Sequence, residues 1–256
     1  GWFNLYWFGL SAVFFMIAIL FTVRGLESKL FTRLKLSKLR INPQAIAVIV
    51  VSLLVFVGSG AFIFYNTNVV NEYQNSDEVK ELRAEYEKTL NQYEFSLQPR
   101  IVDTYVEVDL YPYQRDFKAK GYYILKNKTE EAIAEIHIQE GSDSQLTTKL
   151  SFASPFSEKE KHEKFRYTIY ELEQPLQPGD SIKLEFEVAL ETEGFRESGD
   201  NSEIVYNGTF FNNSSYFPGI GYNPGYELSA DDDRRDHDLE VKERMMDRDN
   251  PWGIGQ

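Results

Sequence analysis

The chain has 256 residues, a formal net charge of −13 and no cysteine. A protein that binds nucleic acid needs a basic surface, so this charge argues against a nucleic-acid partner. Without cysteine the chain forms no disulfide framework and no thiolate metal site. Residues 1–65 carry six basic residues and one acidic residue, so nearly all the acidic residues lie in 66–256. Solubility in water is the simplest explanation of that acidic part.

Two long apolar stretches near the start of the chain predict membrane-spanning helices. The first covers residues 2–23, and the second, residues 45–65, contains no charged residue. A helix needs about 20 apolar residues to cross the hydrocarbon core of a bilayer. In the first stretch the basic residues follow the apolar run, whereas a signal peptide has them in front. Residues 1–65 are therefore predicted to form a transmembrane helical hairpin that lies in the lipid bilayer.

The connector between the two stretches, residues 24–44, is basic. Its six Lys and Arg residues face a single acidic residue, Glu27. Short loops rich in Lys and Arg stay on the cytoplasmic side of a membrane. We therefore expect the hairpin in the cell (inner) membrane, with residues after 65 on the periplasmic or extracellular side. Because the chain starts at Gly1 beside a membrane boundary, we also expect further spans upstream.

Residues 66–99 are predicted to form a membrane-exit segment and a linker helix. Ser76 is a candidate N-cap, and apolar residues then recur at spacings of three and four as far as Tyr93. Pro99 ends this element. The helix either holds the next domain away from the membrane or packs against that domain.

Residues 100–226 are predicted to form an all-β, sandwich-like domain. Alternating apolar and polar residues indicate half-buried strands, and signals such as Pro178-Gly179-Asp180 indicate turns between them. Long helices between the strands are lacking, which disfavours a parallel α/β sheet. The charged stretch 158–164 is interpreted as a solvated loop. The candidate strands are 101–110, 117–125, 133–138, 146–152, 165–172, 182–190 and 203–211.

The last part of the chain is irregular. Residues 211–226 form an aromatic, glycine-rich run that is typical either of a packed corner or of a ligand-binding loop. Residues 227–256 are predicted to form short helices that lead into a further domain. Ser229 is expected to cap the first of them, and the second is expected over 239–246.

Few residues in the chain suit catalysis or metal binding. The three histidines, His137, His162 and His237, are far apart in the sequence. His162-Glu163 begins like the zinc motif His-Glu-x-x-His, but Arg166 stands where the second histidine would be. Neither a phosphate-binding loop nor a Gly-x-Ser-x-Gly elbow is present.

Two other patterns have ordinary explanations as well as functional ones. The cluster Asp231-Asp232-Asp233 fits the start of a helix, where negative charge is favourable. Three short patterns match N-glycosylation acceptors, and they begin at Asn127, Asn207 and Asn212.

A series of motifs, taken together, points to one family. They are Tyr86-Glu87-Lys88, Gln98-Pro99-Arg100-Ile101-Val102-Asp103, Val108-Asp109-Leu110-Tyr111-Pro112, Gly121-Tyr122-Tyr123, Leu125-Lys126-Asn127-Lys128-Thr129 and Gln174-Pro175-Leu176-Gln177-Pro178-Gly179-Asp180-Ser181. In these motifs the chain resembles the N-terminal, non-catalytic β domain of aminopeptidase N-type zinc peptidases.

Four later motifs narrow the resemblance to one branch. They are Asn207-Gly-Thr-Phe-Phe211, Phe217-Pro-Gly-Ile-Gly-Tyr-Asn223, Glu227-Leu228 and Arg234-Arg235. They resemble a bacterial branch in which the peptidase is fused behind the membrane-spanning part of an ABC-type permease. The two apolar stretches would then be the last two spans of that permease.

The resemblance implies a longer protein in which separate domains have separate functions. It places the zinc and its His-Glu-x-x-His ligands in a downstream catalytic domain, so that residues 1–256 hold no catalytic residue and no metal. It implies as partners that downstream domain, a separate ATP-binding subunit and a peptide substrate. Asn212 and Asn213 lie where the family sometimes supplies a residue that anchors the substrate's amine. After Phe217-Pro218 the chain continues as Gly-Ile-Gly, where the common family pattern has Cys-x-Asp-Glu-Pro.

Two other functions fit the same sequence. The first is a two-span membrane protein whose exterior β-sandwich is a binding or assembly module. The second is a permease component whose exterior domain is only structural. The sequence of the gene beyond Gln256 distinguishes these functions from the peptidase fusion.

Overall fold

The structure is a computed structural model that describes residues 1–22, 31, 37–197, 203–210 and 212–242. The chain divides into two compact units. The helical unit contains Gly1–Tyr73 together with residues 193–197. The β unit contains Gln74–Thr192 together with the described residues from 203 onward.

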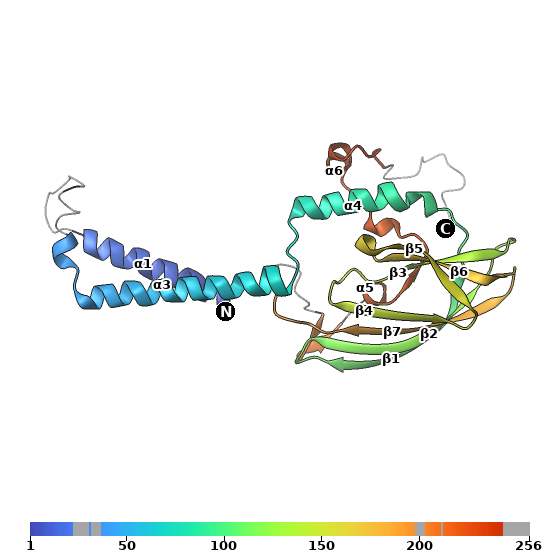
Figure 1. The fold of residues 1–256 in the computed structure, drawn as a ribbon, viewed down its shortest axis with the longest axis horizontal. Helices are drawn as coiled ribbons and strands as arrows, with labels where there is room; N and C mark the ends of the chain where they lie inside the picture. The colour runs from blue at the N-terminus through green and yellow to red at the C-terminus, as the bar shows by residue number, and fades with distance from the viewer. Residues whose placement is uncertain (23–30, 32–36, 198–202, 211, 243–256) are drawn as a thin grey trace. The chain divides into compact units, whose positions relative to one another are not determined.

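The helical unit contains two helices that are long and apolar enough to cross a membrane. They are α1 (Trp2–Phe21) and α3 (Pro43–Phe64), followed by a short π-helix, Tyr65–Val70. The helices lie side by side (Figure 1). Gly9 permits their close approach, because a Cβ atom there would lie 2.9 Å from the backbone nitrogen of Phe56. The predicted spans are thus found as helices, whereas most of the basic connector lies outside the described residues.

Residues 193–197 are held within the helical unit by Asn71, whose side chain is buried. The Asn71 amide nitrogen Nδ2 donates hydrogen bonds to the backbone oxygens of Asn66 at 2.9 Å and Glu193 at 3.0 Å. The Arg196 Nε donates to the Asn71 side-chain oxygen at 3.0 Å. The Phe195 ring also lies 6.0 Å from the ring of Phe62. A segment that the sequence placed inside the β domain therefore belongs to the helical unit.

The β unit begins with the helix α4 (Ser76–Leu90), which packs on the strands of the same unit. Its N-cap is Asn75, so the prediction of Ser76 is wrong by one residue. Asn75 and Glu78 form a capping box: each side chain accepts a hydrogen bond from the other's backbone nitrogen, at 2.9 and 2.8 Å. Tyr86 and Leu90 are buried against residues of the β-sheet, which makes the helix a packed element.

Two four-stranded antiparallel sheets form the body of the β unit (Figure 1). The strand order is β1-β2-β7-β4 in the first sheet and β10-β3-β6-β5 in the second. A small hairpin, β8-β9, forms a third sheet. The bounds are β1 Arg100–Tyr111, β2 Asp116–Lys126, β3 Ile133–Gln139, β4 Leu146–Phe152, β5 Phe156–His162, β6 Tyr167–Leu176, β7 Ser181–Leu190, β8 Ile204–Val205, β9 Gly208–Thr209 and β10 Gly219–Ile220.

One apolar core contains residues from both four-stranded sheets. Phe117 and Leu184 of the first sheet and Ile136 of the second are fully buried in it. Burying one side chain of this size contributes about 1.5–3 kcal/mol. Tyr216 and Phe217 belong to the same core. This part of the aromatic run is therefore a packed corner.

Two sequence predictions in the β unit are wrong. The stretch 158–164 was expected to be a loop, but most of it lies in β5, whose edge position leaves its charged side chains in water. The single strand expected over 203–211 is instead the hairpin β8-β9, because Asn207 and Gly208 favour a tight turn; residue 211 itself is not described.

The C-terminal part also differs from its prediction. The first short helix, α6 (Asp231–Asp236), has Ala230 at its N-cap, so Ser229 does not cap it. Residues 239–242 are not helical, and 243–246 lie outside the described residues. Three acidic residues in the first turn of α6 interact favourably with the helix dipole, as expected.

Gly121 in β2 permits the close pairing of β1 with β2. A Cβ atom at this position would lie 2.2 Å from the backbone oxygen of Tyr105 and 3.0 Å from the Cα of Val106. We therefore expect Gly121→Ala to lower the free energy of unfolding by about 1–3 kcal/mol, since backbone atoms must shift to admit the methyl group. Urea unfolding measures the change. Gly208→Ala is the control, because no atom of the described residues lies within 4 Å of a Cβ atom there.

Candidate functional site

The predicted substrate-facing residues lie at the start of a short helix, α5 (Asn213–Tyr216). Asn212 is its N-cap, and its side-chain oxygen accepts a hydrogen bond from the Ser214 nitrogen at 3.2 Å. Both Asn212 and Asn213 are exposed to solvent. Their side chains are thus accessible to a ligand, and their role toward a substrate stays a prediction.

The histidines occupy separate places in the β unit. His137 is buried, with its Nδ1 atom 2.7 Å from the Tyr167 hydroxyl. The Nε2 atom of His162 lies 3.0 Å from a carboxylate oxygen of Glu160. The ring of His237 lies 2.7 Å from the backbone oxygen of Asp233 at the end of α6. Within the part of the chain that the structure describes, no group of three His, Asp or Glu side chains is arranged to hold a metal ion.

Burial of His137 predicts a dependence of stability on pH. Desolvation lowers the pKa of this imidazole below its ordinary value of 6.5, against the attraction of the nearby Glu135 carboxylate. The unfolded chain therefore binds the proton more readily, and stability falls as the pH is lowered from about 6.5. Thermal unfolding at pH 7.5 and 5.5 measures this loss. We expect His137→Asn to show a smaller pH effect, whereas the control His162→Gln should keep it.

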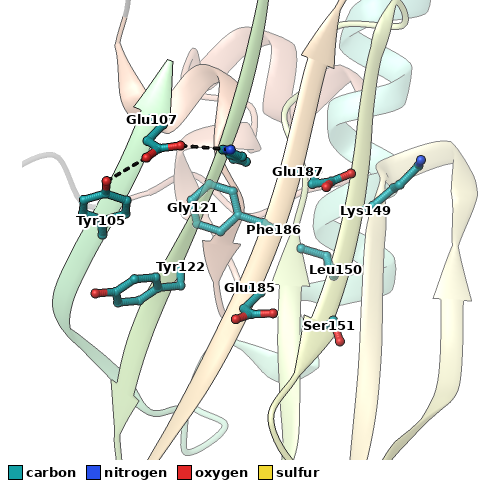
Figure 2. Close-up of a pocket in the computed structure, with 11 residues that line it drawn as sticks. Tyr105, Glu107, Gly121, Tyr122, Lys149, Leu150, Ser151, Glu185, Phe186 and Glu187 are labelled. Atoms are coloured by element: carbon teal, nitrogen blue, oxygen red, sulfur yellow. Dashed lines mark hydrogen bonds and ion pairs between the residues drawn. The ribbon is translucent and has the colours of Figure 1, made fainter. Parts of the chain in front are cut away.

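The outer face of the first sheet carries a hollow of about 370 Å³ (Figure 2). By strand register, one row of side chains crosses all four strands in the order Glu107, Lys120, Glu187 and Lys149. Acidic and basic groups alternate along this row. Such a row favours attraction between neighbouring strands and offers charged groups of both signs to a ligand.

Glu107 is the most strongly engaged carboxylate of this row (Figure 2). One of its oxygens accepts a hydrogen bond from the Tyr105 hydroxyl at 2.8 Å, and the other lies 3.1 Å from the Lys120 nitrogen. The hydrogen bond from Tyr105 and the contact with Lys120 lower the pKa of Glu107. A general base works best with a pKa near the working pH, so this shift makes Glu107 less suited to proton transfer.

A second constellation joins motifs that are far apart in the sequence. The Tyr86 hydroxyl donates a hydrogen bond to the backbone oxygen of Asn223 at 3.2 Å and accepts one from its nitrogen at 3.1 Å. Glu87 and Arg234 form a bidentate ion pair with two contacts of 2.7 Å, and both side chains are buried. The ring of Tyr86 also stacks on Tyr222 at 5.2 Å. The motif at 86–88 therefore meets the motifs at 217–223 and 234–235.

A third constellation centres on Asn127, which is fully buried. Its backbone nitrogen donates to the Asp180 oxygen at 2.9 Å, and its backbone oxygen accepts from the Gly179 nitrogen at 2.9 Å. Its side-chain nitrogen Nδ2 donates to the Leu176 oxygen at 2.8 Å. The motifs at 125–129 and 174–181 are thus joined through one residue. This burial also removes Asn127 as a glycosylation acceptor in the folded chain.

The comparison with known proteins gives no family assignment. Neither a scan against models of protein families nor a search of curated proteins finds a match to this chain. The functional argument therefore depends on the motifs and on the contacts that join them.

Proposed function

We propose that this chain is part of a membrane-bound fusion of an ABC-type permease and an aminopeptidase N-type zinc peptidase. In that protein it supplies the membrane anchor and the non-catalytic N-terminal β domain. Two helices able to span a membrane, followed by an antiparallel β unit, are consistent with the order of parts in such a fusion.

One observation carries the proposal: the motifs that resemble the family contact one another in the fold. Tyr86 contacts Asn223, and Asn127 contacts Asp180, although each pair is separated by more than 50 residues. These contacts are what residues shared by a family for its fold would make.

The proposed fusion gives each part a role. The two sheets form a sandwich that lies outside the cytoplasm and against a downstream catalytic domain, which holds zinc through its own ligands. Asn212 and Asn213 face the peptide substrate, and a separate ATP-binding subunit serves the permease. This arrangement anchors peptide cleavage beside the transporter.

The test compares the full-length natural protein with residues 1–256, both purified in detergent. We expect the full-length protein to contain about one zinc ion per chain and to release the first residue from aminoacyl-coumarin substrates. We expect residues 1–256 to do neither. Activity of the full-length protein should vanish with a chelator and return with zinc. A full-length protein without zinc and without aminopeptidase activity would contradict the proposal.

The location of the β unit can be tested by cysteine labelling, because the chain has no cysteine of its own. We expect Glu173→Cys, at an exposed position of β6, to react with a membrane-impermeant maleimide on intact cells. We expect Lys38→Cys, in the basic connector, to react only after the membrane is opened. The reverse labelling pattern would place the β unit in the cytoplasm and refute the proposed orientation.

A second function is favoured by a separate observation. One long strand at the edge of the first sheet, β1, leaves most of its side chains exposed. Such an edge suits a module that binds a partner by itself. This function requires no zinc and no downstream domain, so the zinc and activity measurements distinguish it from the peptidase fusion.

A further inference from the structure

Two edge strands, β5 and β1, are protected to different degrees. β5, at the edge of the second sheet, has seven residues, is irregular between Glu158 and Glu160, and carries charged side chains on both faces. β1 lies at one edge of the first sheet (Figure 1). It has 12 residues, and all of them except Val106 are exposed. Charges and bulges are the usual devices that prevent an edge from pairing with another strand. β1 is irregular only near its start, between Ile101 and Asp103.

One face of β1 extends the apolar inner face of the first sheet. It lies beyond the part of that face that the core covers. By register, Val108 lies opposite Ala119 and Leu110 lies opposite Phe117. Ala119 and Phe117 are buried in the core. Val108 and Leu110 remain 38% and 41% exposed. Among the described residues, the apolar layer thus ends short of β1 and leaves a strip on which further side chains can pack.

The other face of β1 is acidic. The side chains of Asp103, Tyr105, Glu107 and Asp109 follow one another along this face. The only basic residue of the strand is Arg100, at its beginning. Lys120 of β2 pairs with Glu107 at 3.1 Å. The edge therefore presents main-chain hydrogen-bonding groups between an apolar strip and an acidic strip.

We propose that β1 binds an extended peptide segment by strand addition, and that the segment alternates aliphatic with basic residues. The main chain of such a segment completes the sheet, its Val, Ile or Leu side chains cover Val108 and Leu110, and its Lys or Arg side chains lie opposite the acidic strip. A second copy of β1 is a poorer occupant, because it places acidic residues opposite acidic residues. This proposal does not depend on the peptidase assignment.

The test uses residues 1–256 in detergent and a fluorescein-labelled peptide of four Lys-Val repeats, with binding followed by fluorescence anisotropy. We expect Asp103→Lys combined with Asp109→Lys to weaken binding by about tenfold, because two favourable cross-strand charge pairs become repulsive. We also expect a peptide N-methylated at every second amide, on the side that faces β1, to bind at least about tenfold more weakly. The loss with the methylated peptide identifies main-chain pairing, which general charge attraction does not need.

The matched control is Glu158→Lys combined with Glu173→Lys, which changes the net charge equally on exposed positions of the second sheet. It should leave binding unchanged. An equal loss in this control, or equal binding of the methylated peptide, would show unspecific attraction and overturn the proposal. Light scattering gives one further outcome: a dimer of the chain that does not bind the peptide would make a second copy the occupant and would also overturn it.

Discussion

Replacing Arg234 with alanine is expected to lower the free energy of unfolding of the β unit by about 3–5 kcal/mol. The side chain is 3% exposed and holds both oxygens of the Glu87 carboxylate at 2.7 Å. It also donates a hydrogen bond to the backbone oxygen of Leu228 at 2.7 Å. Its removal leaves a buried carboxylate without its counter-charge. Urea unfolding followed by the near-ultraviolet circular dichroism of the tyrosines measures the change.

The neighbouring residue provides the control. Arg235 pairs with Asp232 at 2.9 Å on the exposed side of α6. Its replacement by alanine should lower the free energy of unfolding by at most about 1 kcal/mol. Changing Glu87 and Arg234 together to methionine should cost less than Arg234→Ala alone, because no buried charge is then left unpaired. Equal effects of Arg234→Ala and Arg235→Ala would contradict the buried ion pair.

Replacing Asn127 with alanine is expected to lower the free energy of unfolding by about 2–4 kcal/mol. The Asn127 side chain donates hydrogen bonds to the backbone oxygens of Glu131 at 2.7 Å and Leu176 at 2.8 Å, and it accepts one from the Thr129 nitrogen at 2.9 Å. Alanine leaves the buried Leu176 oxygen without this donor and also removes the hydrogen bonds to Glu131 and Thr129. Thermal unfolding and the urea midpoint should both fall.

Two variants make this prediction specific. Asn127→Asp keeps the acceptor oxygen but loses both donors, so we expect it to be destabilising as well. Asn213→Ala, at an exposed position at the start of α5, should change stability by no more than about 0.5 kcal/mol. A near-neutral Asn127→Ala would show that this residue does not join the two motifs energetically.

The parts of the fold that follow from burial were predictable from the sequence. Two uninterrupted apolar runs became α1 and α3, and the alternation over 182–190 became β7, because buried side chains impose a period on the chain. β5 was not predicted, because its charged side chains lie in water and solvent imposes no alternation of apolar residues. The N-cap at Asn75 was missed although its signal was present, namely Glu78 three residues later.

The candidate sites were less predictable than the strands. The row from Glu107 to Lys149 requires the register of four strands, which local patterns do not determine. The contacts of Asn127 with Asp180 and of Tyr86 with Asn223 join residues that are distant in sequence. The motifs alone could single out these residues, but only the fold could pair them.

The position of residues 193–197 has a consequence for proteolysis. The chain passes from the helical unit to the β unit after Tyr73, and it returns to the helical unit after Thr192. A protease that cuts once after Tyr73 therefore leaves the β unit joined to residues 193–197. Asn71 and the ring contact of Phe195 with Phe62 still hold those residues on the helices. After this single cut the β unit is therefore still held to the helical unit through residues 193–197.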